Sequence, residues 1–273
     1  MSDAFQSRAS INGRTRIAVI LADPVDQVRT PQGMNAYFSA LGRDAVIVPC
    51  HVAAEDLEEA IMGLRRMRNL DGIIVTVPHK EAVATLCDSL TEEARLVGAV
   101  NAIRRHPDGH LKGGQFDGEG FVAGLHKAGH SVAGRRVLMA GAGGAASGIG
   151  FALLRHGVAA LTIYNRTADR AEALAQRLRD TYPAASISVT GPDPSGHDIV
   201  VNATSLGLRQ DDPMPIDTQR LVPPMVAAEV VMQPEVTPFL TAAAQRGCAT
   251  HGGYPMLAEQ VALLAQFIAG EAD

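Results

Sequence analysis

A glycine-rich turn is the first feature of this sequence that could support chemistry. Val137–Ala140 is an apolar, strand-like run, and the loop after it reads Gly-Ala-Gly-Gly-Ala-Ala-Ser over residues 141–147, before a helix-like stretch. Gly141 would allow a tight turn, Gly143 would let the backbone approach a pyrophosphate, and Ala146 is small enough for close helix–strand packing. Tight strand–helix turns attract glycine in any case. The strand–loop–helix setting nevertheless favours a dinucleotide site, because amides at a helix N-terminus attract phosphate.

The end of the next strand-like run indicates which dinucleotide would bind. An NAD site usually carries an acid about 20 residues after the glycine loop, bonded to the ribose 2′-hydroxyl. Here the run ends at Tyr164 and continues as Asn165-Arg166-Thr167, with Arg170 one helical turn later. A guanidinium matches the charge and geometry of a 2′-phosphate, so the sequence favours NADP. The alternative is that both arginines are ordinary surface residues and Asn165 caps a helix. A methyltransferase would also carry a glycine loop, but it normally has an acid at this strand end.

Two further polar side chains, Lys80 and Gln260, have local settings that could suit chemistry. Lys80 follows Pro78, a residue typical of the first turn of a helix. The positive end of a helix dipole destabilises a charged lysine, which would suit proton transfer. Gln260 lies between Leu257 and Val261, beside an apolar helical stripe. A buried amide needs hydrogen-bond partners, which substrate hydroxyls would supply. The alternatives are a solvated lysine and a glutamine bonded to neighbouring backbone.

The elements that would position these residues fall into two series of alternating strands and helices. The first series predicts strands at Ile17–Leu21, Ala45–Pro49 and Gly72–Val77, and helices at Pro31–Leu41 and Glu55–Arg68. The second predicts strands at Val137–Ala140, Leu161–Tyr164 and Ile199–Val201, and helices at Ala146–Arg155 and Ala168–Arg179. A helix at Asp117–Gly129 would join the two series, and an amphipathic helix at Met256–Ile268 would end the chain. We therefore expect an α/β fold of two domains with a cleft between them.

Composition and charge exclude several classes of protein. The chain has 273 residues, of which 47% are hydrophobic and 19% charged, the balance of a globular protein with enough length for two domains. The formal net charge of -5 provides no broad basic surface, so neither nucleic acid nor a membrane is expected as a partner. No apolar run approaches the roughly 18 residues that a membrane helix needs.

Cysteine and histidine usage argues against structural disulfides and metal sites. Cys50, Cys87 and Cys248 lie far apart without a CxxC pair, which suits a reducing compartment. The nine histidines lack metal-ligand spacing, so no metal is expected, and His79 and His251 are interpreted as peripheral. The polar N-terminal segment contains acids and does not resemble a targeting signal. These features predict a cytoplasmic protein.

Seven segments, in this order, resemble the shikimate dehydrogenase family. They are Val75-Thr-Val-Pro-His-Lys80, Asp88 with Gly98-Ala-Val-Asn101, Asp117-Gly-x-Gly120, Gly141–Ser147, Asn165-Arg-Thr167, Val201-Asn-Ala-Thr-Ser-x-Gly207 and Gly253-x-x-Met-Leu-x-x-Gln260. Each motif is modest alone, but their order and spacing together are specific and span most of the chain.

The resemblance implies an NADP-dependent dehydrogenase. It would reversibly reduce 3-dehydroshikimate to shikimate, in aromatic amino acid biosynthesis, or perform the same reaction on a related cyclic polyol. Lys80 and Asp117 would handle the hydroxyl proton while hydride passes between substrate carbon and nicotinamide. The substrate-binding residues would be Thr30, Thr76, Asn101 and Gln260, with Arg29 as a further carboxylate partner. The cofactor-binding residues would be Gly141, Gly143, Gly144, Ala145, Asn165, Arg166, Thr167, Arg170, Thr204 and Gly253.

The same resemblance implies the division into domains and leaves some alternatives open. Residues 1–116 together with 253–273 would form the substrate-binding and catalytic domain, and residues 117–252 a Rossmann-like NADP-binding domain. Quinate dehydrogenase activity and a nucleotide-binding homologue without turnover remain alternative functions. The chain is compatible with a monomer or a homodimer.

The sequence departs from the family pattern where a polar substrate would bind. The family's Ser-x-Ser-Pro loop is Val28-Arg-Thr-Pro31 here, so one hydroxyl is lost and Thr30 retains the other. Polar residues of the family are also replaced by Ile74, by Phe116 and by Met232. Each lost hydrogen bond to a charged group is worth about 1.5–3 kcal/mol. Unless Arg29 holds a carboxylate bidentately, the substrate should be less polar than shikimate or lack its carboxylate.

Overall fold

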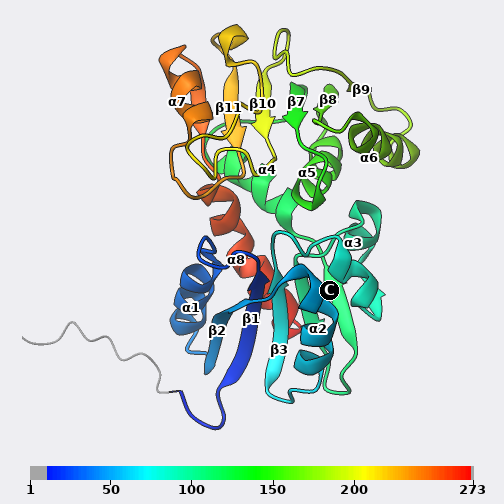
Figure 1. The fold of residues 1–273 in the computed structure, drawn as a ribbon, viewed down its shortest axis with the longest axis vertical. Helices are drawn as coiled ribbons and strands as arrows, with labels where there is room; N and C mark the ends of the chain where they lie inside the picture. Colours follow the sequence, from blue (N-terminus) through cyan, green and yellow to red (C-terminus); the bar gives the residue numbers. More distant parts are fainter. Residues whose placement is uncertain (1–10, 272–273) are drawn as a thin grey trace, which may run out of the picture. The chain divides into compact units, whose positions relative to one another are not determined.

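The computed structural model describes residues 11–271, which form two compact α/β units (Figure 1). The first unit contains the described chain up to Gln115 and again from Val261 onward. The second unit is Phe116–Gln260. The final helix, α8 (Tyr254–Ala269), therefore begins in the second unit and ends in the first. The predicted α/β fold in two parts is confirmed.

The first unit contains a six-stranded mixed sheet in the order β2-β1-β3-β5-β6-β4. Its strands are β1 (Arg16–Ala22), β2 (Ala45–His51), β3 (Leu70–Val75), β4 (Ser89–Leu90), β5 (Ala102–Arg105) and β6 (Leu111–Gly114). β1 pairs in parallel with β2 and β3, as the alternating pattern predicts. β5 runs antiparallel to both β3 and β6. The three strands predicted for the first series therefore pair in parallel, and the antiparallel strand β5, which was not predicted, adjoins β3.

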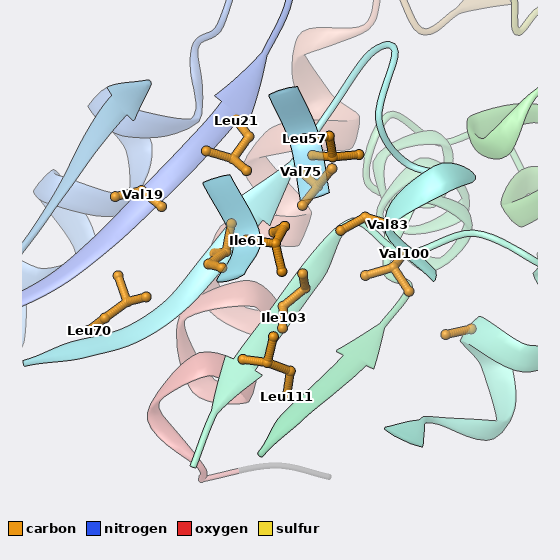
Figure 2. Packing of buried hydrophobic residues seen from close by; sticks show 12 residues of the cluster. Val19, Leu21, Leu57, Ile61, Leu70, Val75, Val83, Val100, Ile103 and Leu111 are labelled. Atoms are coloured by element: carbon orange, nitrogen blue, oxygen red, sulfur yellow. The ribbon is translucent and has the colours of Figure 1, made fainter. Parts of the chain in front are cut away.

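Helices surround this first sheet. They are α1 (Thr30–Ala40), the short 3₁₀ helix η1 (Ala54–Asp56), α2 (Leu57–Arg65), the 3₁₀ helix η2 (Ala82–Leu86) and α3 (Glu92–Val97). Leu57 and Ile61 of α2 pack with Leu21, Val75 and Ile103 of the strands (Figure 2). Elsewhere in the unit, a Cβ on Gly72 of β3 would lie 2.6 Å from Ile268, so α8 packs closely against that strand.

The second unit contains a six-stranded parallel sheet in the order β12-β11-β10-β7-β8-β9. Its strands are β7 (Arg136–Ala140), β8 (Ala160–Tyr164), β9 (Ile187–Val189), β10 (Ile199–Asn202), β11 (Val226–Glu229) and β12 (Ala249–His251). Its helices are α4 (Asp117–Lys127), α5 (Gly144–Arg155), α6 (Ala168–Thr181), the 3₁₀ helix η3 (Thr218–Arg220), α7 (Pro238–Gln245) and the start of α8. The strand order reverses beside β7, which is where ligands bind in open parallel sheets.

Most predicted elements are present, and two of them in the first unit differ clearly from their predicted bounds. The predicted helix Glu55–Arg68 is only η1 and α2, and Arg68 lies beyond its end. The carbonyl groups of Arg65 and Arg68 accept hydrogen bonds from the side chains of Arg105 and Arg16, so they are used outside the helix. The strand predicted at Gly72–Val77 begins earlier and ends at Val75, leaving Val77 47% exposed. No helix in the described residues 11–271 is long and apolar enough to cross a membrane.

Candidate functional site

The glycine loop lies at the carboxyl edge of the second sheet, as the sequence predicts. Gly141 follows β7 with a φ of 123°, and its N–H donates to the carbonyl of Tyr164 at the end of β8. A Cβ on Gly141 would lie 2.6 Å from the carbonyl oxygen of Ala203. Glycine is therefore required here both for the left-handed backbone and for the close approach of the loop after β10. Ala146 is fully buried, in agreement with its predicted packing role.

The start of α5 has the chemistry of an anion site. Gly143 is its N-cap residue, no side chain caps the helix, and the first turn contains no acidic residue. The first amides of a helix have no intrahelical acceptor, and the helix dipole favours negative charge there. Gly144 and Ala145 form the first turn. The uncapped amides and the side-chain-free Gly141 thus fit the pyrophosphate of a dinucleotide.

The residues predicted to hold a 2′-phosphate follow β8. Asn165 donates from Nδ2 to the carbonyl of Thr167 at 2.9 Å, which shapes the turn into α6. Thr167 is the N-cap residue of α6, and Arg170 lies in its first turn. Arg166, Thr167 and Arg170 are exposed, so their side chains reach solvent beside this strand end.

The turn after β10 completes this edge of the sheet. Asn202 ends β10, fully buried, and its Oδ1 accepts hydrogen bonds from the backbone N–H and the hydroxyl of Thr204 at 3.1 and 2.6 Å. Gly253, the last predicted cofactor residue, is equally constrained, because a Cβ there would lie 2.5 Å from the carbonyl oxygens of Val230 and Val231. The structure thus gathers the glycine loop, the Asn165 turn and the Thr204 turn around the carboxyl ends of β7, β8 and β10.

In the first unit, three predicted residues meet at the carboxyl end of β3. The N–H of Thr76 donates to the carbonyl of Leu21 at 3.1 Å, which joins it to the end of β1. Asn101, only 3% exposed, accepts from the N–H of Val75 at 2.9 Å. The carbonyl of Lys80 accepts from the N–H of Val100 at 2.8 Å. Backbone hydrogen bonds therefore bring Thr76, Lys80 and Asn101 to one edge of the sheet.

Arg29 and Thr30 lie where the loop after β1 enters α1. Arg29 is the N-cap residue, and Thr30 is the first helical residue, 7% exposed. The same loop is tied to the segment before Lys80, because the N–H of Asp23 donates to the carbonyl of Val77 at 3.1 Å.

The helical setting predicted for Lys80 is wrong. Residues 77–81 form turns, and the five-residue 3₁₀ helix η2 begins two residues after Lys80. The Lys80 carbonyl accepts from Val100, which is distant in sequence, instead of starting an α-helical ladder. The helix-dipole argument for this lysine therefore does not apply, and its role must rest on its position beside Thr76 and Asn101.

Asp117 and Gln260 belong to the second unit. Asp117 is the first residue of α4, 3% exposed, and the N-cap position is taken by Phe116. Gln260 of α8 is 5% exposed, and a Cβ on Gly120 would lie 2.3 Å from its Cγ. The absence of a side chain at Gly120 thus lets Gln260 pack against the first turn of α4. Gln260 is buried, as its position beside the apolar stripe predicts.

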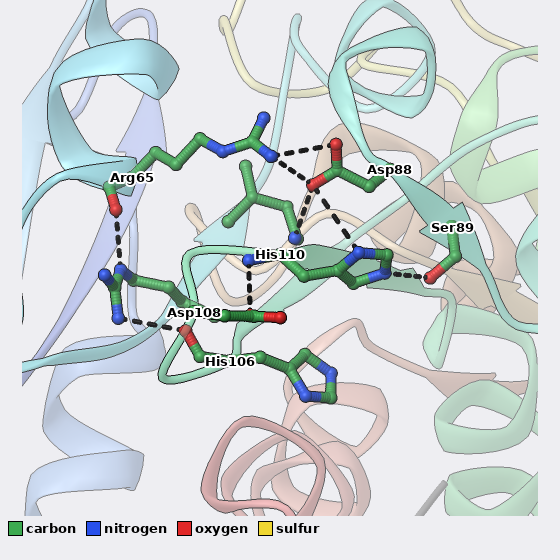
Figure 3. A network of polar contacts seen from close by, with 8 residues as sticks. Arg65, Asp88, Ser89, His106, Asp108 and His110 are labelled. Carbon is green, nitrogen blue, oxygen red and sulfur yellow. Dashed lines mark hydrogen bonds and ion pairs between the residues drawn. The ribbon is translucent and has the colours of Figure 1, made fainter.

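Asp88, part of the family-like segment, stabilises a hairpin. Its carboxylate accepts from Nη2 of Arg65 at 2.9 and 2.7 Å and from the N–H of Leu111 at 2.7 Å (Figure 3). The Leu111 amide, and then Arg65, lower the pKa of Asp88. The neighbouring His110 pairs with Ser89 at 2.8 Å. These contacts hold β6 against the segment that carries Asp88. Asp88 therefore anchors the hairpin formed by β5 and β6, which follows Asn101 in the chain.

His79 and His251, interpreted from the sequence as peripheral to the site, are both buried. His79 is 1% exposed, and its Nε2 lies 2.8 Å from the carbonyl oxygen of Val52. His251 is 5% exposed at the end of β12, where burial and His130 lower its pKa. Among residues 11–271, no three His, Cys, Asp or Glu side chains gather to form a metal site.

One buried acid was not predicted as part of the site. Glu229 ends β11 with no solvent exposure, and burial raises its pKa to about 7, while hydrogen bonds from Thr237 and Asn202 oppose that rise. The sequence offered a partial signal, because Thr237-Pro238 is a typical helix start that would turn the chain back beside the end of β11.

Comparisons with known proteins agree with this geometry. The family model "Shikimate dehydrogenase substrate binding domain" matches residues 20–103, and "Shikimate / quinate 5-dehydrogenase" matches residues 124–209. The NADP(+)-dependent shikimate dehydrogenase of Rubrobacter xylanophilus is 40% identical over 92% of this chain and 89% of its own length. That of Rhodospirillum rubrum is 38% identical over 92% and 90%.

Solved structures also resemble this chain over most of its length. A shikimate dehydrogenase in complex with NADP+ is 30% identical and matches with a TM-score of 0.87 over 96% of this chain and 92% of its own. A 5-ketofructose reductase of Gluconobacter sp. strain CHM43 is 34% identical, with a TM-score of 0.82 over 95% and 94%.

Proposed function

Since this chain belongs to the shikimate dehydrogenase family, we propose that it is an NADP-dependent oxidoreductase that interconverts a secondary alcohol and a ketone on shikimate or a related polyol. The observation that carries the proposal is the edge of the second sheet, where Gly141, the uncapped start of α5 and the Asn165–Thr167 turn lie together. The Thr76, Lys80 and Asn101 cluster of the first unit supplies the polar groups for the substrate.

Different proposed cofactor residues would contact different parts of the dinucleotide. Gly141, Gly143, Gly144 and Ala145 would hold the pyrophosphate through backbone amides. Asn165, Arg166, Thr167 and Arg170 would hold the adenosine 2′-phosphate, and Thr204 and Gly253 would bound the remainder of the site. When bound, NADP supplies the chemistry of accepting and returning a hydride.

The proposed catalytic residues manage the proton. In the oxidative direction the alcohol loses a hydride from carbon and a proton from oxygen, and Lys80 Nζ receives that proton as the ketone forms. Asp117 is proposed to orient the lysine and to offset its charge. Thr30, Thr76, Asn101 and Gln260 bind substrate hydroxyls, and Arg29 pairs with a carboxylate where the substrate has one. Residues 1–116 with 253–273 would form the substrate domain, and 117–252 the NADP domain.

The apolar replacements favour a second candidate substrate class. Val28, Phe116 and Met232 are half-buried, and Ile74 is 3% exposed at the end of β3. None of the four can bond a carboxylate, and the 5-ketofructose reductase is as similar to this chain as many shikimate dehydrogenases are. The second candidate is therefore reduction of a polyhydroxylated ketone that has no carboxylate.

A substrate panel tests the proposal. We would measure kcat/KM for NADP+ and NAD+ with shikimate and with quinate, and for NADPH with 5-ketofructose. Efficient use of shikimate with NADP+ would mean that Arg29 and Thr30 suffice for the carboxylate. Efficient use of 5-ketofructose alone would establish the second candidate. Tight NADPH binding without turnover of any substrate would contradict both and favour a non-catalytic nucleotide-binding protein.

The partner is a small hydroxylated molecule, with neither nucleic acid nor membrane involved, and the protein is a monomer or homodimer. The free cysteines Cys50, Cys87 and Cys248 suit a cytoplasmic location.

A further inference from the structure

The carboxyl group of Glu229 is bonded on one oxygen only. Oε2 accepts a hydrogen bond from the hydroxyl of Thr237 at 2.9 Å and one from Nδ2 of Asn202 at 3.4 Å. Oε1 is buried and has no hydrogen-bond partner among the described residues. Both partner side chains are themselves fully buried. Two donors converge on one acceptor oxygen, which is the arrangement that an ionised carboxylate satisfies best.

Asn202 transmits this contact to the turn that follows β10. Its Nδ2 also donates to the carbonyl of Leu206 at 2.9 Å, and its Oδ1 accepts from Thr204. The hydroxyl of Thr204 in turn accepts from the N–H of Leu206 at 3.0 Å. One asparagine side chain therefore fixes the backbone of the whole turn from Asn202 to Gly207.

Thr237 joins the same turn to α7. Its hydroxyl donates to Glu229 and accepts from the N–H of Leu240 at 3.2 Å, so it also caps the helix. A Cβ on Gly207, whose φ is 104°, would lie 3.2 Å from Thr237. At its other end, the turn abuts the glycine loop through Ala203 and Gly141. Glu229 is thus connected to the backbone that bounds the proposed nucleotide site.

We propose that Glu229 is a positioning residue for the nucleotide site: its carboxylate holds Asn202 and Thr237, and through Asn202 it keeps the Asn202–Gly207 turn in the shape that receives the cofactor. The inference rests on the proposed function only in identifying the turn as part of an NADP site. The ordering of the turn by the Glu229 carboxylate does not require a bound ligand.

Protonation of this carboxyl at neutral pH should loosen the turn. Glu229 titrates near pH 7, because burial raises its pKa to about that value. A proton on Oε1 would be a donor without an acceptor, and a neutral carboxyl accepts more weakly from Asn202 and Thr237. The ionised form therefore orders the turn and binds the cofactor more tightly.

The elements and loops that adjoin Glu229 carry other titratable groups. β12 carries His251, whose pKa is lowered by burial, and the loop after β10 carries Asp212, whose pKa is lowered by the N–H groups of Arg209 and Gly207. Asp211 lies in the same loop, Glu235 lies before α7, and Arg246 is the C-cap residue of α7, where its Nε donates to the carbonyl of Leu221. Variants of Glu229 itself are needed to separate its titration from theirs.

The test compares Glu229→Gln with wild type and with Glu235→Gln. Glu235 is an exposed acid on the connection between β11 and α7, so its variant is a matched control. The dissociation constant for NADPH would be measured by fluorescence from pH 6 to pH 8.5. We expect Glu229→Gln to weaken binding roughly tenfold at pH 8, the lower end of what a hydrogen bond to a charged group is worth. The ratio of variant to wild-type constants should approach one at pH 6, and titration of the ligand cancels in that ratio.

Two outcomes would overturn the proposal. A ratio that is the same at every pH would mean that Glu229 only supports the fold. A ratio below one at pH 8, with wild type binding more tightly at low pH, would mean that its charge repels the cofactor. If Glu229→Gln does not fold, Thr237→Val with Thr237→Ser as its control tests the same contact, and only the valine should weaken binding.

A measurement without ligand separates this inference from the proposed function. Hydrogen exchange at the amides of Thr204 and Leu206, corrected for the intrinsic pH dependence, should show greater protection at pH 8 than at pH 6 in wild type. Glu229→Gln should abolish the difference and Glu235→Gln should retain it. Unchanged protection in wild type would sink the inference even if NADPH binds. A wild type that shows the protection change but binds no NADPH would contradict the proposed function alone.

Discussion

At the scale of single residues, Lys80 and Arg166 carry the two halves of the proposed chemistry, and each lies in a different unit. Their predicted roles are therefore separable, since removing one should leave the site of the other intact. Lys80 lies in a turn after β3, and Arg166 lies in the turn after β8.

We expect Lys80→Ala to reduce kcat by about 10²–10⁴-fold, the usual contribution of a positioned acid–base group. The dissociation constant for NADPH should change little, because the cofactor residues lie in the second unit. Steady-state kinetics and NADPH titration would measure the two effects. Lys112→Ala, a lysine of β6 in the same unit, is the control, and unchanged turnover in Lys80→Ala would remove the catalytic assignment.

Arg166→Ala should weaken binding of NADPH far more than binding of NADH. The lost group is a guanidinium opposite a phosphate that only NADPH carries, so a loss of roughly 10-fold or more is expected for NADPH alone. Titration of both nucleotides would measure the difference, with Arg179→Ala as control because that arginine pairs with Glu172 on α6. Equal weakening of both nucleotides would exclude a 2′-phosphate contact.

At the scale of elements, the loop after β7 and the turn after β10 approach each other closely because Gly141 has no side chain. Gly141 and Gly157 both have positive φ, 123° and 77°, but only at Gly141 would a Cβ collide with neighbouring backbone. Nothing lies within 4 Å of a Cβ on Gly157. The two positions therefore separate the conformational cost of alanine from the cost of displacing the turn after β10.

Gly141→Ala should abolish measurable NADPH binding and lower the free energy of unfolding by more than Gly157→Ala does. The second variant should cost about 1 kcal/mol, the usual penalty for a left-handed alanine, and bind NADPH normally. Urea unfolding followed by circular dichroism and NADPH titration would measure both. Normal NADPH binding by Gly141→Ala would mean that the cofactor does not use this loop.

At the scale of the whole molecule, the buried Glu229 makes stability depend on pH in a direction opposite to that of most acids. The pKa of about 7 in the folded protein lies above the ordinary value of 4.5. Between these values the folded state retains a proton that the unfolded state has lost, so the carboxyl destabilises the protein increasingly as pH rises, and the effect is complete above pH 7. Acids such as Asp88, whose pKa is lowered, act in the opposite sense.

Glu229→Gln should therefore be as stable as wild type near pH 4, below both pKa values, and more stable at pH 8. The gain at pH 8 is about 3 kcal/mol if the variant's amide is accommodated, from 1.36 kcal/mol for each pKa unit. Urea unfolding of both proteins across this range would measure the difference. A variant that is more stable yet binds NADPH more weakly would show that Glu229 lowers the stability of the protein while it positions the Asn202–Gly207 turn for the cofactor. A constant difference in stability across the range would contradict the elevated pKa.

The sequence by itself determined the α/β class, the position of the glycine loop and the burial of Gln260. Each of these follows from local pattern: apolar runs alternate with helical stripes, and glycine occupies a tight strand–helix turn. Motif order along the chain further identified the family, which the similarity of relatives over 92% of the chain confirms. The strands β5 and β6 were missed, although Asp108-Gly109 between them is a typical hairpin turn.

Tertiary structure alone decided the features that depend on residues distant in sequence. Lys80 lies outside any α-helix because its carbonyl meets Val100, and Asp88 anchors a hairpin because Arg65 and Leu111 reach it from either side. Glu229 became a buried acid because the register of β10 and β11 places it opposite Asn202 and α7 returns Thr237 to its other side. Local propensity cannot encode such contacts, since burial and the pKa that follows from it are set by whichever segments pack together in the folded chain.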